Sequence, residues 1–137
     1  MHDDTWPAEW LRGALSLCVL GIVARHGPEG TYGYAIAREL AAAGFGKVKG
    51  GTLYPLLNRL EADGHVAASW IPGEGGPGRK SFAMTSAGRE HLRARRAEWQ
   101  AFTRRTTQLL DQADPADPAD ASDRLDRTDR TPREGQA

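Results

Sequence analysis

The chain has 137 residues, of which 39% are hydrophobic, and its equal numbers of basic and acidic side chains give a formal net charge of zero. A chain of this length can build one modest core, which excludes a second large domain. Its only cysteine is Cys18, and its four histidines are scattered, so the sequence excludes a disulfide framework and predicts no metal site and no cofactor.

Charge is unevenly placed along the chain. Residues 1–110 carry 14 Lys and Arg against 10 Asp and Glu, a balance of +4, whereas residues 111–137 carry 4 against 8, a balance of −4. A mildly basic folded part favours a nucleic-acid partner, although an excess of this size is also typical of a solvated surface. The apolar residues 11–23 are too few and too interrupted to span a bilayer, so we expect a cytoplasmic protein with no membrane partner.

Two helices are predicted in the first third of the chain. Pro7 and Glu9 favour a helix that begins after Thr5 or Trp6 and runs to about Arg25 or His26. Residues 15–23 are apolar nearly all round, which indicates burial on more than one side. A second helix is predicted from residue 31 to about residue 43, and the glycine-containing turn 44–46 then leads into a third. Two short helices joined in this way are typical of a helix-turn-helix.

Residues 50–64 predict one complete short helix. Leucines at i, i+3, i+4 and i+7 give it a single apolar side. Thr52 is expected as its N-cap, Pro55 would then fall harmlessly in the first turn, and Gly64 would end the helix. Its outward side is mostly polar and carries Tyr54, Asn58, Arg59 and Ala62. Two lysines, Lys47 and Lys49, lie just before the helix. A protein needs such a helix to enter a DNA major groove.

After Gly64 the hydrophobic period changes from 3.6 to 2. Two strands, 65–71 and 79–84, flank the Gly- and Pro-rich segment 72–78, which predicts a β-hairpin or wing. Arg79 and Lys80 would meet phosphates on the returning strand. Glycine spacing in the loop also resembles a phosphate-binding loop, but Arg79 follows Gly78 directly and a strand follows instead of a helix. No catalytic constellation is found, so the sequence does not predict an enzyme.

The last predicted helix is capped by Thr85 or Ser86 and spans residues 87–110. It carries an apolar seam, and it is longer than a domain of this size can cover. The seam therefore needs a partner, unless it folds back on its own domain. From Asp111 aspartate recurs every third residue, so residues 111–137 are predicted to be a disordered tail. Such a tail could compete with DNA for the basic face, but a role in solubility is favoured.

Several of these segments resemble one family. Residues 51–61 followed by Gly64 closely resemble the third helix of PadR-type winged-helix transcriptional regulators. Gly33-Tyr34 followed by Ile36 resembles the second-helix motif of that family, and residues 78–82, leading into Met84-Thr85 and Gly88, resemble its wing, as does Trp70. The resemblance covers residues 11–110.

The expected fold is mostly α with a small β-hairpin: a winged helix-turn-helix domain, residues 5–86, and a long C-terminal helix, 87–110. The resemblance implies a short form in which this single helix pairs two subunits through Leu92, Trp99, Phe102, Leu109 and Leu110. It also implies a repressor that is relieved by a small hydrophobic or aromatic effector. Trp6, Trp10, Trp99 and Phe102 could line the pocket for that effector in a homodimer, although core packing is an alternative use for any of them.

The expected partner is double-stranded DNA, held as an inverted repeat by a homodimer. The candidate DNA-binding residues are Tyr34, Lys47, Lys49, Thr52, Tyr54, Asn58, Arg59, Arg79 and Lys80. Two of them have another reading, since Tyr34 could be a core aromatic and Arg59 could pair with Glu61 or Asp63. The alternative function is a winged-helix protein-interaction module, against which the basic residues favour DNA.

Overall fold

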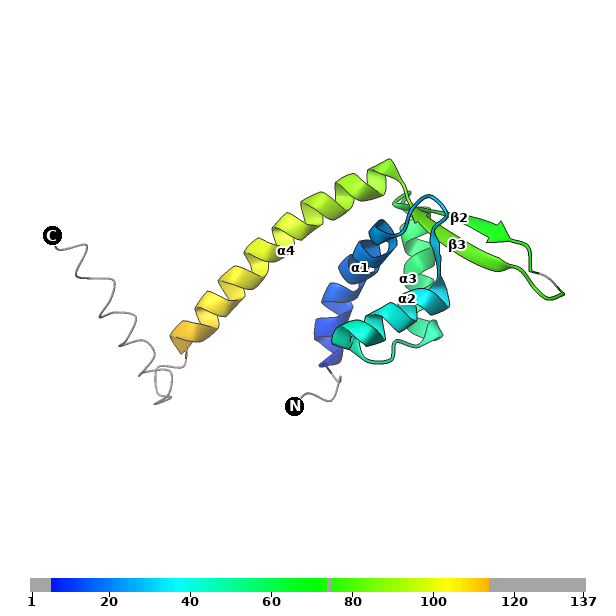
Figure 1. Cartoon of the computed structure of the whole chain (residues 1–137). Helices are drawn as coiled ribbons and strands as arrows, with labels where there is room; N and C mark the ends of the chain where they lie inside the picture. Colours follow the sequence, from blue (N-terminus) through cyan, green and yellow to red (C-terminus); the bar gives the residue numbers. More distant parts are fainter. Residues whose placement is uncertain (1–5, 74, 114–137) are drawn as a thin grey trace. The chain divides into compact units, whose positions relative to one another are not determined.

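The computed structural model describes residues 6–73 and 75–113 of the chain (Figure 1). In chain order its elements are α1 (Ala8–Arg25), β1 (Thr31–Tyr32), α2 (Gly33–Leu40), the π-helical turn η1 (Ala41–Phe45), α3 (Gly50–Ala62), β2 (Val66–Ile71), β3 (Arg79–Met84) and α4 (Ser86–Ala113). The mostly α fold with a small hairpin is confirmed. The chain divides into two compact units with the boundary inside α4, so that one unit ends at Ala97 and the other begins at Glu98.

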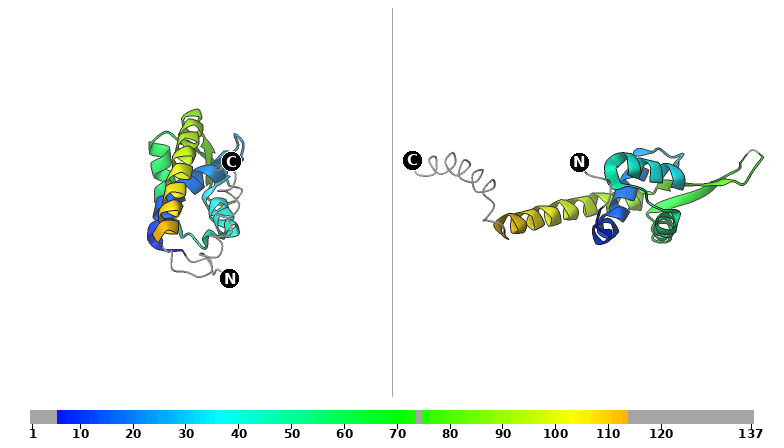
Figure 2. Two further views of the ribbon diagram at one scale, coloured as in Figure 1. Left: turned by 90° about the vertical axis from the view of Figure 1, so that its left-hand side faces the viewer. Right: turned by 90° about the horizontal axis from the view of Figure 1, so that it is seen from below.

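The hydrophobic core lies among α1, α2, α3 and the base of the hairpin. Helix α1 contributes side chains from more than one side, as its apolar sequence predicts. The core residues are Leu15, Val19, Leu20, Ile22, Val23, Ile36, Leu40, Leu53, Leu57, Leu60, Val66 and Phe82. From this base the β2–β3 hairpin extends away from α1, α2 and α3 (Figure 2). The wing is therefore held only at its root.

Strand β1 was not predicted. The sequence pattern predicts Thr31 and Tyr32 at the start of the second helix, whereas they pair with β3 in a sheet of order β1-β3-β2. Gly30 makes this pairing possible because its φ is 78° and a Cβ there would lie 2.4 Å from the carbonyl oxygen of Phe82. Ser81 Oγ also donates a hydrogen bond to the carbonyl of Glu29 at 2.7 Å. The start of α2 is thus fastened to the wing.

Helix α3 begins earlier than predicted. Thr52 is not its N-cap, because the carbonyl of Lys49 already accepts hydrogen bonds from the backbone N–H groups of Thr52 and Leu53, at 2.9 and 3.0 Å. The helix therefore starts at Gly50, and Pro55 lies inside it instead of in the first turn.

The end of α3 agrees with the prediction. Gly64 has a φ of 81°, and its N–H donates to the carbonyl of Glu61 at 3.0 Å. The N–H of His65 donates to the carbonyl of Leu60 at 2.9 Å, which completes a Schellman motif.

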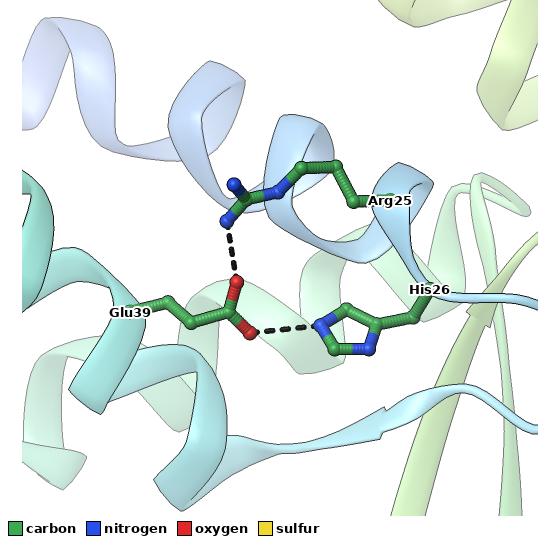
Figure 3. Close-up of polar contacts among 3 residues, drawn as sticks. All are labelled: Arg25, His26 and Glu39. Carbon is green, nitrogen blue, oxygen red and sulfur yellow. Dashed lines mark hydrogen bonds and ion pairs between the residues drawn. The ribbon is translucent and has the colours of Figure 1, made fainter.

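A carboxylate on α2 joins it to the end of α1 (Figure 3). Glu39 accepts a hydrogen bond from the guanidinium of Arg25, and its other oxygen lies 2.8 Å from Nε2 of His26. All three side chains are at least partly exposed, so the cluster adds modestly to the packing of the two helices.

Helix α4 is capped by Thr85, one of the two residues predicted for that role. Its hydroxyl accepts from the N–H of Gly88 at 2.9 Å and donates to the carbonyl of Gly64 at 2.6 Å. The helix runs three residues past the predicted end, so Asp111 to Ala113 are helical, and the rest of the predicted tail lies outside the described residues. None of the helices described, α4 included, is long and apolar enough to cross a membrane.

Candidate nucleic-acid interface

Helix α3 presents two chemically different faces. Leu53, Leu57 and Leu60 are buried in the core, and Leu56 is partly buried against it. The residues predicted to face outward are all exposed: Tyr54, Asn58, Arg59 and Ala62. Thr52, which was predicted as the N-cap, is exposed as well. The leucine ladder thus holds α3 by one side and leaves a polar side available to a partner.

The ring of Tyr54 lies against two glycines. A Cβ built on Gly33, the first residue of α2, would lie 2.6 to 2.7 Å from three atoms of the Tyr54 side chain. A Cβ on Gly50 would lie 3.3 Å from the same ring. Tyr54 remains 46% exposed, so these contacts fix its position without removing it from the surface.

A second aromatic group forms beside Tyr54. The rings of Tyr32 and Tyr34 are stacked, with centroids 5.8 Å apart and an interplanar angle of 7°. The guanidinium carbon of Arg79 lies 5.6 Å from the Tyr32 ring centroid and 5.3 Å from that of Tyr34. Arg79 also donates a hydrogen bond to the Tyr34 hydroxyl at 3.0 Å. Tyr34 is exposed, so the reading of this residue as a core aromatic does not apply.

The other basic residue of the wing root is bound differently. The ammonium of Lys80 lies 3.1 Å from a carboxylate oxygen of Glu61 and 5.6 Å from the centroid of the Phe82 ring. Glu61 is therefore paired with Lys80. Within the described part of the chain Arg59 forms no ion pair with Glu61 or Asp63. The positive charge of Arg59 is exposed on the outward side of α3.

An open hollow of about 540 Å³ joins these groups. It is lined by Tyr32, Gly33, Tyr34, Tyr54, Trp70, Gly78, Arg79 and Lys80. Four of these were predicted site residues, drawn from α2, α3 and β3. Tyr32 and Trp70 were not predicted as site residues, and Trp70 is 68% exposed on β2. The resemblance of Trp70 to the wing of the family indicated its strand, and the pairing of Trp70 with Lys80 across the hairpin places it at the hollow.

Lys47 and Lys49 complete the basic side of the interface. Both are exposed in the segment that leads into α3. Lys49 is also the residue that precedes the first helical turn, so its charge adds to the positive end of the helix dipole. Backbone N–H groups and lysines at a helix start favour an anion such as a phosphate.

The predicted dimerisation residues divide between the two units. In the first unit Leu92 is half-buried against the core and helps to line an open groove of about 610 Å³ between α1 and α4. In the second unit Trp99, Phe102, Leu109 and Leu110 are all exposed, and the rings of Trp99 and Phe102 have centroids 6.0 Å apart. Apolar side chains at these positions of α4 are thus left uncovered in the single chain.

The remaining predicted pocket residues belong to the first unit. The indole N–H of Trp6 donates to the carbonyl of Gly44 at 2.8 Å, and the ring centroid of Trp6 lies 6.5 Å from that of Trp10, which is exposed.

Burial raises the pKa of the Cys18 thiol, which makes this thiol a poor nucleophile. Within residues 6–73 and 75–113 no three His, Cys, Asp or Glu side chains are placed to hold a metal ion.

These features define a winged helix-turn-helix protein with an exposed polar recognition helix. A sequence profile of the transcriptional regulator PadR-like family matches residues 19–94, more than half of the chain. The chain therefore belongs to the PadR-like family of transcriptional regulators, which are DNA-binding proteins and not enzymes.

Solved structures of two PadR-type regulators and of one further transcriptional regulator are similar to this chain over most of their length. A PadR family regulator from Eggerthella lenta is 35% identical, with a TM-score of 0.66, over 74% of this chain and 86% of that one. A PadR-like regulator from Bacillus cereus is 29% identical, with a TM-score of 0.64, over 75% and 97%. A Streptococcus transcriptional regulator is 29% identical, with a TM-score of 0.64, over 76% and 99%. A search of curated protein sequences found no significant match.

Proposed function

We propose that the protein is a sequence-specific transcriptional repressor that binds its operator as a homodimer in the cytoplasm. One observation carries the proposal: α3 is anchored in the core by Leu53 and Leu57 while Thr52, Tyr54 and Asn58 are exposed. A helix held in this way can place its polar side against base edges in a major groove.

The exposed residues have different roles in this proposal. Thr52, Tyr54 and Asn58 reach base edges or the phosphates beside them, and an Asn amide can bind adenine through two hydrogen bonds. Lys47, Lys49 and Arg79 neutralise phosphates, which sets register and salt dependence and not sequence choice. Tyr34 and Lys80, which line the hollow, contribute further contacts to the phosphates. The exposed Arg59 contacts phosphates farther along α3.

The uncovered apolar residues of α4 support the dimer. Leu109 and Leu110 are each more than 60% exposed, and burying them against a second copy removes this apolar surface from water. A two-fold dimer places two α3 helices in successive major grooves, so the operator is an inverted repeat with half-sites about 34–36 Å apart.

We further propose that a small hydrophobic or aromatic effector relieves repression. Trp6, Trp10, Trp99 and Phe102 supply the aromatic surface, and an effector bound among them in the dimer would change the spacing of the two α3 helices. Trp99→Ala should then abolish induction in a reporter assay while the dimer persists. Normal induction by a dimeric Trp99→Ala protein would contradict the pocket.

The DNA-binding proposal is tested by mobility shift on the intergenic DNA upstream of the gene, at two salt concentrations. The wild-type protein should bind tightly in the presence of competitor DNA. Tyr54→Ala should lose about 5- to 150-fold in affinity, the range for one lost base contact. Tyr54→Phe, which keeps the ring between Gly33 and Gly50, separates the contribution of the hydroxyl from that of the ring.

Two outcomes would contradict the proposal. Weak binding that is equal on any DNA would remove sequence specificity for this operator region. No binding at low salt, by a protein shown to be a folded dimer, would favour the protein-interaction module, whose affinity would also change little with salt.

A further inference from the structure

The register of the sheet places Arg79 beside the start of α2. Tyr32 pairs with Ser81, and β1 ends there because α2 begins at Gly33. Strand β3 starts two residues before Ser81, so it passes the end of β1 and brings Arg79 level with the first residues of α2. Side chains two apart on a strand lie on the same face, so Arg79 shares the face of Ser81 and not that of Lys80.

At this position the guanidinium meets two aromatic rings and no carboxylate. Its carbon lies within 6 Å of the centroids of both Tyr32 and Tyr34, and it donates to the Tyr34 hydroxyl. Arginine is weakly hydrated and stacks readily on aromatic faces. Within residues 6–73 and 75–113 Arg79 takes part in no ion pair.

Lys80 provides the contrast. It is paired with Glu61, whose carboxylate offsets part of the positive charge of Lys80. A pair of tyrosines restrains a cation while leaving its full positive charge. Of the two neighbouring basic residues, Arg79 is therefore restrained without a counter-charge, whereas Lys80 shares its charge with Glu61 and also connects the wing to α3.

We propose that Tyr32 is a positioning residue for DNA binding, which together with Tyr34 holds the Arg79 guanidinium in place for one phosphate of the DNA backbone. The inference rests on the proposed function and adds to it a residue outside the predicted interface. A long side chain that is already ordered loses less freedom on binding, a gain of about 3- to 10-fold in affinity for each protomer.

The test is a double-mutant cycle on a mixed-sequence duplex of about 30 base pairs, three helical turns, because a phosphate contact does not depend on sequence. Affinity is measured over a range of salt concentrations for the wild type, Tyr32→Leu, Arg79→Ala and the double variant. Tyr32→Phe keeps the ring and should bind as the wild type does.

Arg79→Ala should reduce the slope of log K against log salt by about 0.9 for each protomer bound. When Arg79 is present, Tyr32→Leu should weaken DNA binding about 3- to 10-fold for each protomer. In the Arg79→Ala protein, Tyr32→Leu should have no further effect on affinity. An equal loss from Tyr32→Leu in both backgrounds, or no loss in either, would overturn the inference.

A second measurement needs no DNA. Nuclear magnetic resonance relaxation at Arg79 Nε in the free protein should report an ordered side chain in the wild type and in Tyr32→Phe, and a mobile one in Tyr32→Leu. Equal mobility in all three would overturn the positioning role. If the side chain is ordered as expected but the wild type binds no duplex, the failure lies in the proposed function, and Tyr32 positions nothing for DNA.

Discussion

The absence of a side chain at Gly33 determines where the ring of Tyr54 lies. A single methyl group on Gly33 would come within 2.6 Å of that ring, and real Cβ atoms do not make contacts this short. Tyr54 is half-exposed and can move away, so the helix itself has no reason to unfold. Gly33 thus belongs to the interface although it can donate no side-chain contact.

Gly33→Ala should therefore weaken DNA binding about as much as Tyr54→Ala, while the free energy of unfolding changes by no more than about 1 kcal/mol. Titrations by fluorescence anisotropy and urea unfolding measure the two effects. The matched control is Gly13→Ala on α1, where a Cβ would meet nothing within 4 Å. It should keep DNA affinity and gain about 0.5–1 kcal/mol of stability. Wild-type affinity in Gly33→Ala would contradict the role of this contact.

The single residues of α3 were largely predictable, but those of the hollow were predicted only in part, since Tyr32 and Trp70 were missed. The spacing of the leucines is a local pattern, and it alone indicates that Tyr54 and Asn58 face outward. Tyr32 acquires its place only by meeting Arg79, 47 residues later, and no local pattern records that meeting. Trp70 likewise depends on the pairing of β2 with β3.

Among the elements, α4 depends on one hydroxyl at its start. Thr85 binds the N–H of Gly88 and also the carbonyl of Gly64, so it joins the end of α3 to the beginning of α4. Gly88 is buried there, and a Cβ at this position would lie 2.0 Å from the carbonyl oxygen of His65, so the packing leaves no room for a side chain. The cap is therefore also a tertiary contact.

Thr85→Ala should lower the free energy of unfolding of the first unit by about 1–2 kcal/mol, since both an N-cap and a second hydrogen bond are lost. Thr85→Ser keeps the hydroxyl and should cost well under half as much. Chemical denaturation followed by circular dichroism compares the three proteins. Equal losses in Ala and Ser would show that the methyl group matters and not the cap.

The elements that the sequence did not predict are those whose ends are set by distant partners. Strand β1 has two residues, too few for a period, and exists because β3 offers it an edge. Helix α3 starts at Gly50 although Gly is a poor helix former and Lys49 has no capping side chain. Contacts with Tyr54 and the core outweigh these local preferences. The prediction of Thr52 as the N-cap was wrong for this reason.

At the scale of the whole molecule, the exposed apolar residues of α4 determine the predicted assembly. Leu109→Asp should convert the proposed dimer to a monomer, because it places a charge where apolar surface would be buried. The neighbouring Gln108→Asp adds the same charge at an exposed polar position and should leave the dimer intact. Sedimentation velocity at several concentrations measures both. A dimeric Leu109→Asp protein would place the interface elsewhere.

Helix α4 has one buried residue, Gly88, in its first turn, and its residues from Glu98 onward bury none. In the proposed dimer the residues of α4 from Glu98 onward pack against a second copy of the chain, so this packing is second order in protein concentration. The melting temperature of this part of α4 therefore rises as the protein is concentrated. Operator occupancy then follows roughly the square of the monomer concentration at low copy number. A twofold change in expression would then alter operator occupancy about fourfold, so gene dosage would affect the response steeply.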